Sequence, residues 1–80
     1  MEWGKRIIAL VLVQNSKKVG LTNSQIAQIN GTFAQIKGLL DTGSLNTAKD
    51  AITAISPDGV LVTQEDKDIY LAEINAYPGL

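Results

Sequence analysis

The sequence predicts a small all-α protein, a single domain over residues 1–80 that forms a bundle of about four helices. Apolar residues recur at spacings of three and four, threonines followed three positions later by Gln or Asp mark helix starts, and Gly or Pro follows the apolar stretches. The predicted helices cover residues 2–18, 23–41, 45–55 and 64–76.

The first predicted helix carries an apolar run from Ile7 to Val13. Lys17 and Lys18 would lie in its last turn, and Gly20 could take the left-handed conformation that ends helices. A strand over the apolar run is the alternative, because short β-branched runs fit either structure. As a helix, the run is apolar on all sides, which predicts burial on all sides and, in so small a protein, help from another chain.

The second predicted helix has the most clearly marked boundaries. Thr22 precedes it as a potential N-cap, Gln25 completes a capping box, and Gly43 marks its end. One face carries apolar residues at alternating spacings of three and four, which is typical of a helix packed against other helices. These residues are Ile26, Ile29, Phe33, Ile36 and Leu40.

The nearly opposite face of the same helix carries a stripe of small residues. Each glycine inside a helix costs about 1 kcal/mol relative to alanine, so two on one face indicate a closely packed neighbouring helix. The alternative is a weakly specified exposed face. Together with the apolar first helix, the stripe predicts an interface. Its candidate residues are Trp3, Ile8, Leu12, Ala27, Gly31, Ala34 and Gly38.

The third and fourth predicted helices share the pattern Leu-x-Thr-x-x-Asp, a threonine cap followed by an acidic residue. In the third helix this cap is Thr47, with a start at Ser44 as the alternative, and a Ser-Pro-Asp-Gly turn over residues 56–59 would end the helix. In the fourth helix the cap is Thr63. The residues expected to face the core are Ala48, Ile52, Ile55, Tyr70, Leu71, Ile74 and Tyr77.

The composition excludes most catalytic chemistry. With no Cys and no His, the chain cannot build Cys and His zinc sites, a cysteine nucleophile or a Ser-His-Asp triad. Glu65, Asp66 and Asp68 form the densest acidic group, but acidic residues in the first turn of a helix interact favourably with its positive end. We therefore expect no enzymatic activity, no metal and no cofactor.

The segment from Asp58 to Glu65 resembles the second half of an EF-hand calcium loop, with Gly59 at the sharp turn. The resemblance implies a closing carboxylate at Glu65. The first half does not match, because Ala54 and Ser56 occupy the leading ligand positions. Since EF-hands need most of their oxygen ligands, we expect no calcium binding.

The formal net charge of −1 hides an asymmetry between the halves of the chain. Residues 1–40 carry five basic side chains and one acidic, whereas residues 41–80 carry two basic and seven acidic. Either the halves fold against each other, or copies dock head to tail. A helix-turn-helix DNA binder is the alternative function, but the third helix offers only Lys49, beside Asp50, as a cation.

The absence of Cys gives no indication of an oxidising compartment. The apolar run near the start has seven residues, whereas a membrane span needs about 20, and no small-residue cleavage site follows. We therefore expect a cytoplasmic protein without a membrane span. The sequence favours a structural or adaptor protein that acts as a homo-oligomer or through a protein partner, with nucleic-acid regulation as the alternative.

Overall fold

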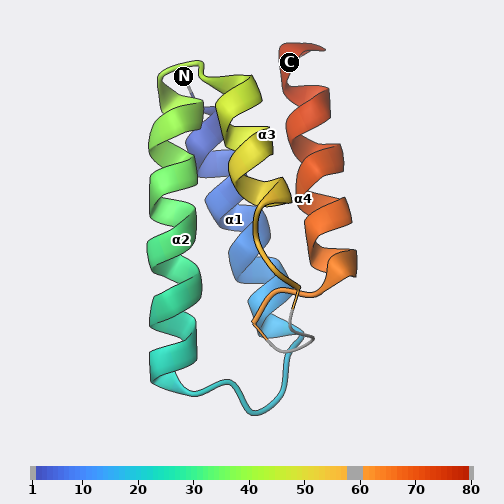
Figure 1. The fold of residues 1–80 in the computed structure, drawn as a ribbon. Helices are drawn as coiled ribbons and strands as arrows, with labels where there is room; N and C mark the ends of the chain where they lie inside the picture. Colours follow the sequence, from blue (N-terminus) through green and yellow to red (C-terminus); the bar gives the residue numbers. More distant parts are fainter. Residues whose placement is uncertain (1, 58–60, 80) are drawn as a thin grey trace.

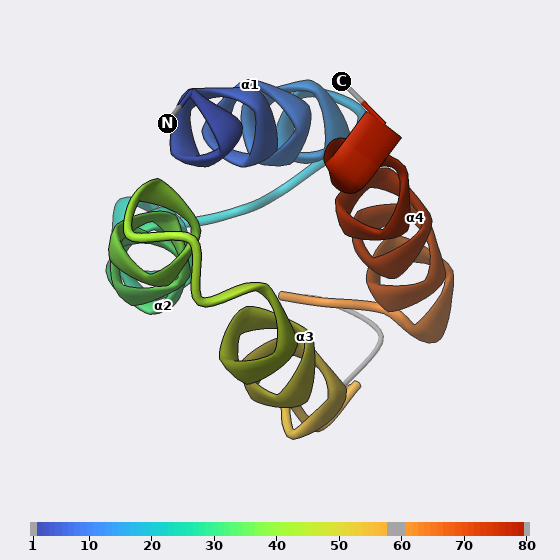
Figure 2. The same ribbon diagram turned by 90° about the horizontal axis from the view of Figure 1, so that it is seen from above.

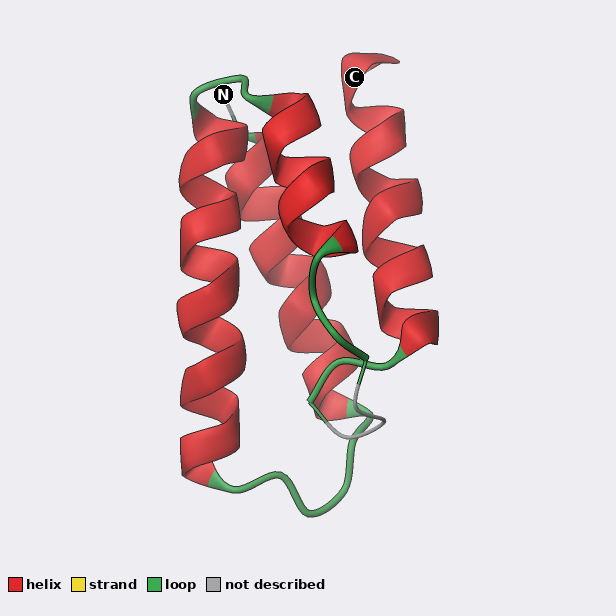
Figure 3. Cartoon of the chain, viewed as in Figure 1, coloured by secondary structure: helices red, strands yellow, loops and turns green. Residues whose placement is uncertain are grey.

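A computed structural model describes residues 2–57 and 61–79 of the chain. It contains four α-helices and one short 3-10 helix, and Figure 3 shows only helices and loops in this part of the chain. The predicted all-α class is therefore confirmed, and the apolar run at residues 7–13 is helical. The elements are α1 (Trp3–Ser16), α2 (Asn23–Asp41), α3 (Leu45–Thr53), α4 (Gln64–Ala76) and η1 (Tyr77–Gly79).

The helices alternate in direction and form a ring around one core (Figures 1 and 2). α1 packs against α2 and α4, and α3 packs against the same two helices on the other side. Helices that follow one another in sequence are thus neighbours in space, as short connections favour. Within the described ranges, no helix is both long enough and apolar enough to cross a membrane.

Both ends of α2 are set by local interactions. At its start the Gln25 N–H donates to Thr22 Oγ1 over 3.1 Å, and the Thr22 N–H donates back to Gln25 Oε1 over 2.8 Å, so the predicted capping box is present. At its end Gly43 has φ +79°, and the Ser44 N–H donates to the Leu39 carbonyl over 2.8 Å. The positive φ of Gly43 and the bond from Ser44 to Leu39 are typical of a Schellman motif. The predicted bounds of α2 are confirmed.

Two helices end earlier than predicted. α1 stops at Ser16 rather than at residue 18, because the Lys17 and Lys18 N–H groups donate to the Gln14 and Asn15 carbonyls three residues back, which is a tighter turn than an α-helix. Gly20 does have a positive φ, +85°, but it shapes the loop to α2 rather than the end of α1.

α3 spans only Leu45 to Thr53, not residues 45–55. The Lys67 ammonium donates to the carbonyls of Thr53 and Ile55 over 2.9 and 2.7 Å, which holds the chain after α3 in a non-helical path. Thr47 lies inside α3 and is not a cap, because the turn at Gly43 starts the helix directly after it. Asp58 and Gly59, which complete the predicted turn, lie outside the described residues.

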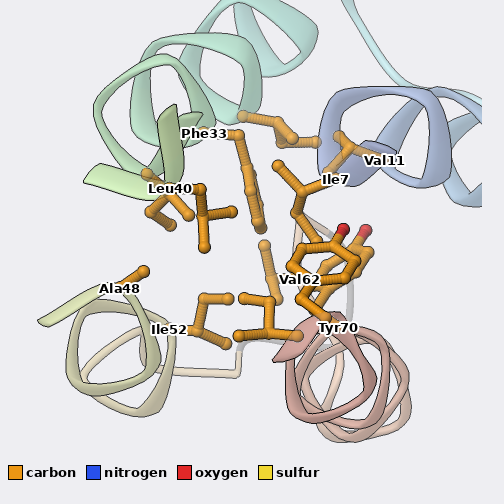
Figure 4. Close-up of a cluster of buried hydrophobic side chains, with 12 residues drawn as sticks. Ile7, Val11, Phe33, Leu40, Ala48, Ile52, Val62 and Tyr70 are labelled. Atoms are coloured by element: carbon orange, nitrogen blue, oxygen red, sulfur yellow. The ribbon is translucent and has the colours of Figure 1, made fainter. Parts of the chain in front are cut away.

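The core is formed by one apolar cluster at the centre of the ring (Figure 4). The Phe33 and Tyr70 rings pack edge to face, with centroids 4.9 Å apart and planes 69° apart, a favoured geometry for aromatic pairs. Ala48, Ile52, Tyr70, Ile74 and Tyr77 are buried as predicted, whereas Ile55 and Leu71 are half-buried at the margin.

The prediction that α1 is buried on all sides is wrong for the single chain. Ile7 and Val11 face the core, but Leu12 and Val13 are 57% and 51% exposed. α1 has only two helical neighbours, so its outward side has no helix to cover it. An apolar helix face is therefore left open.

Candidate interaction surface

The structure does not bring the seven candidate interface residues together on one surface. Trp3 stacks on Tyr77, with ring centroids 5.7 Å apart, and so belongs to the packing of α1 against η1. Ile8 is half-buried against the core, and Leu12 is exposed. Four small candidates are exposed on the outward face of α2, namely Ala27, Gly31, Ala34 and Gly38.

Within the chain, no helix packs closely on the small-residue stripe. A Cβ added at Gly31 or at Gly38 would have no neighbour within 4 Å. The expectation of a close helix contact at these glycines is therefore wrong for the single chain, because α1 and α3 pack on other faces of α2. Contact between chains at this stripe stays a prediction.

The close approach of two helices occurs instead at Gly4, which the sequence reasoning missed. Gly4 is buried, and a Cβ at this position would lie 2.6 Å from Lys37 Cγ and closer still to the Asp41 carboxylate. The Gly4 N–H donates to Asp41 Oδ1 over 3.2 Å. An acidic side chain of α2 thus satisfies an orphan donor at the positive end of α1, where Lys5 and Arg6 are the wrong charge for the dipole.

A second electrostatic contact joins the end of α1 to the start of α4. Asp66 is buried, and its carboxylate accepts from Gln14 Nε2 over 3.1 Å and from the Thr63 N–H over 3.1 Å, and it pairs with the Lys18 ammonium at 2.7 Å. Burial by itself raises the pKa of Asp66, but these partners lower it by more, and the net pKa lies below 3.8.

Asp66 therefore acts as a structural anion, and the acidic group predicted around it does not converge on a site. Glu65 and Asp68 are exposed, and Gln64 donates to Asp68. Sequence reasoning missed the role of Gln14. The sequence feature that could have indicated this role is the place of Gln14, a polar residue on the same helix face as Ile7 and Val11.

Internal contacts occupy several basic side chains. Lys18 pairs with Asp66, Lys37 pairs with Asp41 at 2.6 Å, and Lys67 is buried against the carbonyls after α3. Arg6 lies 4.0 Å from Glu73 of α4. The charged halves of the chain thus meet in part at the seam between α1 and α4. In α3, Lys49 is half-buried beside the exposed Asp50.

The exposed face of α1 combines apolar and basic residues. Ala9, Leu12 and Val13 lie on its outward side, between Lys5 near one end and Lys17 at the other. Lys17 is the C-cap residue and keeps helical backbone angles, so it continues the register of α1. An apolar centre with a polar rim is the usual composition of a protein interface.

A groove of about 270 Å³ lies where α3 falls short of the longer α2. Its lining is mostly apolar, and residues 55, 56, 61 and 62 line one side of it. The lining residues are Gln28, Ile29, Thr32, Ile55, Ser56, Leu61 and Val62.

The described ranges contain no group of three or more acidic residues placed to hold a metal ion. In the EF-hand-like segment, Asp58 and Gly59 lie outside these ranges, and Glu65 is an exposed residue in the first turn of α4. Among the described residues, the exposed face of α1 is therefore the most distinctive candidate surface.

Comparison with known proteins assigns no family to this chain. A scan of protein-family models, a search of curated proteins and a search of solved structures found no match to it. Its function is therefore inferred from the surface and the contacts described above.

Proposed function

We propose that this chain is a small, non-enzymatic helical module that works by protein–protein contact through the exposed face of α1, bound either to another copy or to a partner protein. This proposal is supported by the observation that the exposed apolar side chains gather in one region of the chain. Among the described residues, the large hydrophobic side chains that are exposed are Leu12, Val13 and Val19. All three lie in α1 or in the loop that follows it.

The exposed apolar side chains of α1 carry a free-energy cost in water. Single exposed apolar residues are ordinary, but neighbouring ones on one helix leave apolar area in water. Covering Leu12 and Val13 recovers roughly 25 cal/mol for each Å² buried. Polar residues at these two positions would leave the core unchanged, since Ile7 and Val11 face inward from the same helix. The open face thus makes contact with another protein favourable.

Photo-cross-linking in the native host tests the proposal. A photoreactive amino acid replaces Leu12 on α1 or, as a matched control, Asn46 on the exposed side of α3. Both positions are exposed, so both variants should fold. We expect a discrete protein adduct from position 12 and none from position 46. Equal labelling at the two positions, or no adduct from position 12, would contradict the proposal.

A further inference from the structure

The exposed charges on α1 and α4 have opposite sign and lie on stripes with the same spacing. In the described part of the chain, the ion pairs leave Lys5 and Lys17 without a carboxylate partner, and Glu65 and Asp68 without a cationic partner. Lys17 donates to the Gln14 side chain, and Asp68 accepts from Gln64, so both are held but not neutralised.

Each stripe runs along its helix at intervals of four residues. On α1 the stripe is Ala9, Val13 and Lys17, and on α4 it is Asp68, Ala72 and Ala76. All six side chains are exposed. Residues four apart form the ridges by which helices interlock.

The two stripes match when one helix runs antiparallel to the other. With Lys17 set against Asp68, Val13 meets Ala72 and Ala9 meets Ala76 in the same register. The largest apolar side chain of one stripe then packs on a small residue of the other, and the charges pair at one end. Glu65, one turn before Asp68, adds a second carboxylate near Lys17. Other faces lack this complementarity, because the exposed residues of α2 are uncharged and α3 offers a short, polar face.

We propose that copies of this chain associate head to tail, the exposed face of α1 on one copy docking antiparallel on the exposed face of α4 on the next. This inference rests on the proposed function and names a second copy as the partner. The contact joins two different surfaces, so it repeats from copy to copy and gives a ring or an open chain. One helix face buries less than the roughly 800 Å² per partner of a standard interface, so we expect the association to be weak and to appear only at high protein concentration.

Sedimentation equilibrium at increasing protein concentration measures this association. Charge reversal at one position, Lys17→Asp or Asp68→Lys, should weaken self-association about tenfold or more, because like charges then face each other. An equimolar mixture of the two variants should associate again, since each provides the face that matches the other. A chain that carries both substitutions should also self-associate, because position 17 of one copy again faces an opposite charge at position 68 of the next. Raising the salt from 0.1 to 1 M shortens the Debye length from about 10 to about 3 Å and should weaken the wild-type contact.

Asp50→Lys on α3 is the matched control, because it makes the same charge change at an exposed site outside both stripes. It should leave association unchanged, and melting curves in dilute solution should show that every variant is folded at the temperature of the sedimentation experiment. A wild-type chain that stays at the 8.6 kDa mass of one copy up to about 1 mM overturns the inference. So does a mixture that fails to associate, or an Asp68→Lys variant that associates as well as wild type. If position 12 still cross-links to a different protein, the proposed function stands while head-to-tail association falls.

Discussion

The Lys18 ammonium lies 2.7 Å from the Asp66 carboxylate and ties the end of α1 to the first turn of α4. The same ammonium donates to the Leu61 carbonyl over 2.6 Å, so one cation holds both the loop before α4 and the helix itself. Little of either side chain is exposed, 16% for Lys18 and 6% for Asp66. This pair is therefore screened less by solvent than an exposed ion pair would be.

Replacing Asp66 with Asn should lower the free energy of unfolding by about 2–4 kcal/mol, because Lys18 then keeps a buried charge without its anion. Urea unfolding in dilute solution measures the loss. Glu65→Gln is the matched control, since Glu65 is an exposed carboxylate in the same helical turn. It should change the free energy of unfolding by no more than about 0.5 kcal/mol. Equal effects of the two substitutions would show that the buried pair has no special role.

Stability should fall in acid, partly through Asp66. The folded-state pKa of Asp66 lies below the ordinary 3.8, so its contribution is complete above that value and is lost as the pH falls through the folded pKa. The pKa of Asp41 is also lowered, by Lys37 and by the Gly4 N–H. Urea unfolding at several pH values from about 6 down to about 2 should show a steeper loss for wild type than for Asp66→Asn. Parallel curves would rule out this contribution.

The glycines at positions 4, 31 and 38, which lie inside α-helices, should respond to alanine with opposite signs. Gly31→Ala and Gly38→Ala should each stabilise the chain by about 0.4–1 kcal/mol, because both positions are open and alanine favours the helix. Gly4→Ala should instead destabilise by about 1–3 kcal/mol, because its Cβ would collide with the Lys37 and Asp41 side chains. Thermal unfolding distinguishes the two outcomes. A stabilising alanine at Gly4 would mean that α1 and α2 are less closely packed there.

Asn15 should be a site where a nonpolar residue is favourable. Both polar atoms of its side-chain amide are buried without a hydrogen-bond partner, and such burial costs about 1–3 kcal/mol per unsatisfied group. Asn15→Leu, of similar size, should therefore raise the melting midpoint. Asn75→Leu controls for helix propensity, because Asn75 is exposed and is also the second-last residue of its helix. A gain no larger at Asn15 than at Asn75 would contradict the argument.

How well each element could be predicted depends on where its determinants lie in the chain. Thr22, Gln25 and Gly43 act on residues close to them, so the bounds of α2 were predicted correctly. The segments that follow α1 and α3 are held by Lys18 and Lys67, whose partners lie 43 and 12 to 14 residues away. No local pattern contains that information.

The candidate surface likewise depends on contacts between distant parts of the chain. A hydrophobic pattern shows that residues 7–13 are apolar on all sides, but not that α1 has only two helical neighbours in the ring. The glycine that needs close packing was likewise hidden, since the atoms that crowd Gly4 belong to residues of α2. The small-residue stripe at Gly31 and Gly38, in contrast, could be seen in the sequence. Its regular spacing does not depend on whether another helix packs on it.

The hydrogen bond from the Gly4 N–H to Asp41 of α2 has a consequence for the order in which the helices form. The start of α1 has no side-chain cap of its own, and its N–H at Gly4 finds an acceptor only after α2 has placed Asp41 there. α2 carries its own start and stop signals and is 19 residues long, enough for transient helix in the unfolded chain. In the transition state for folding, substitutions in α2 should therefore have higher φ-values than those in α1. The open face of α1 would then be among the last surfaces to take shape as the chain folds.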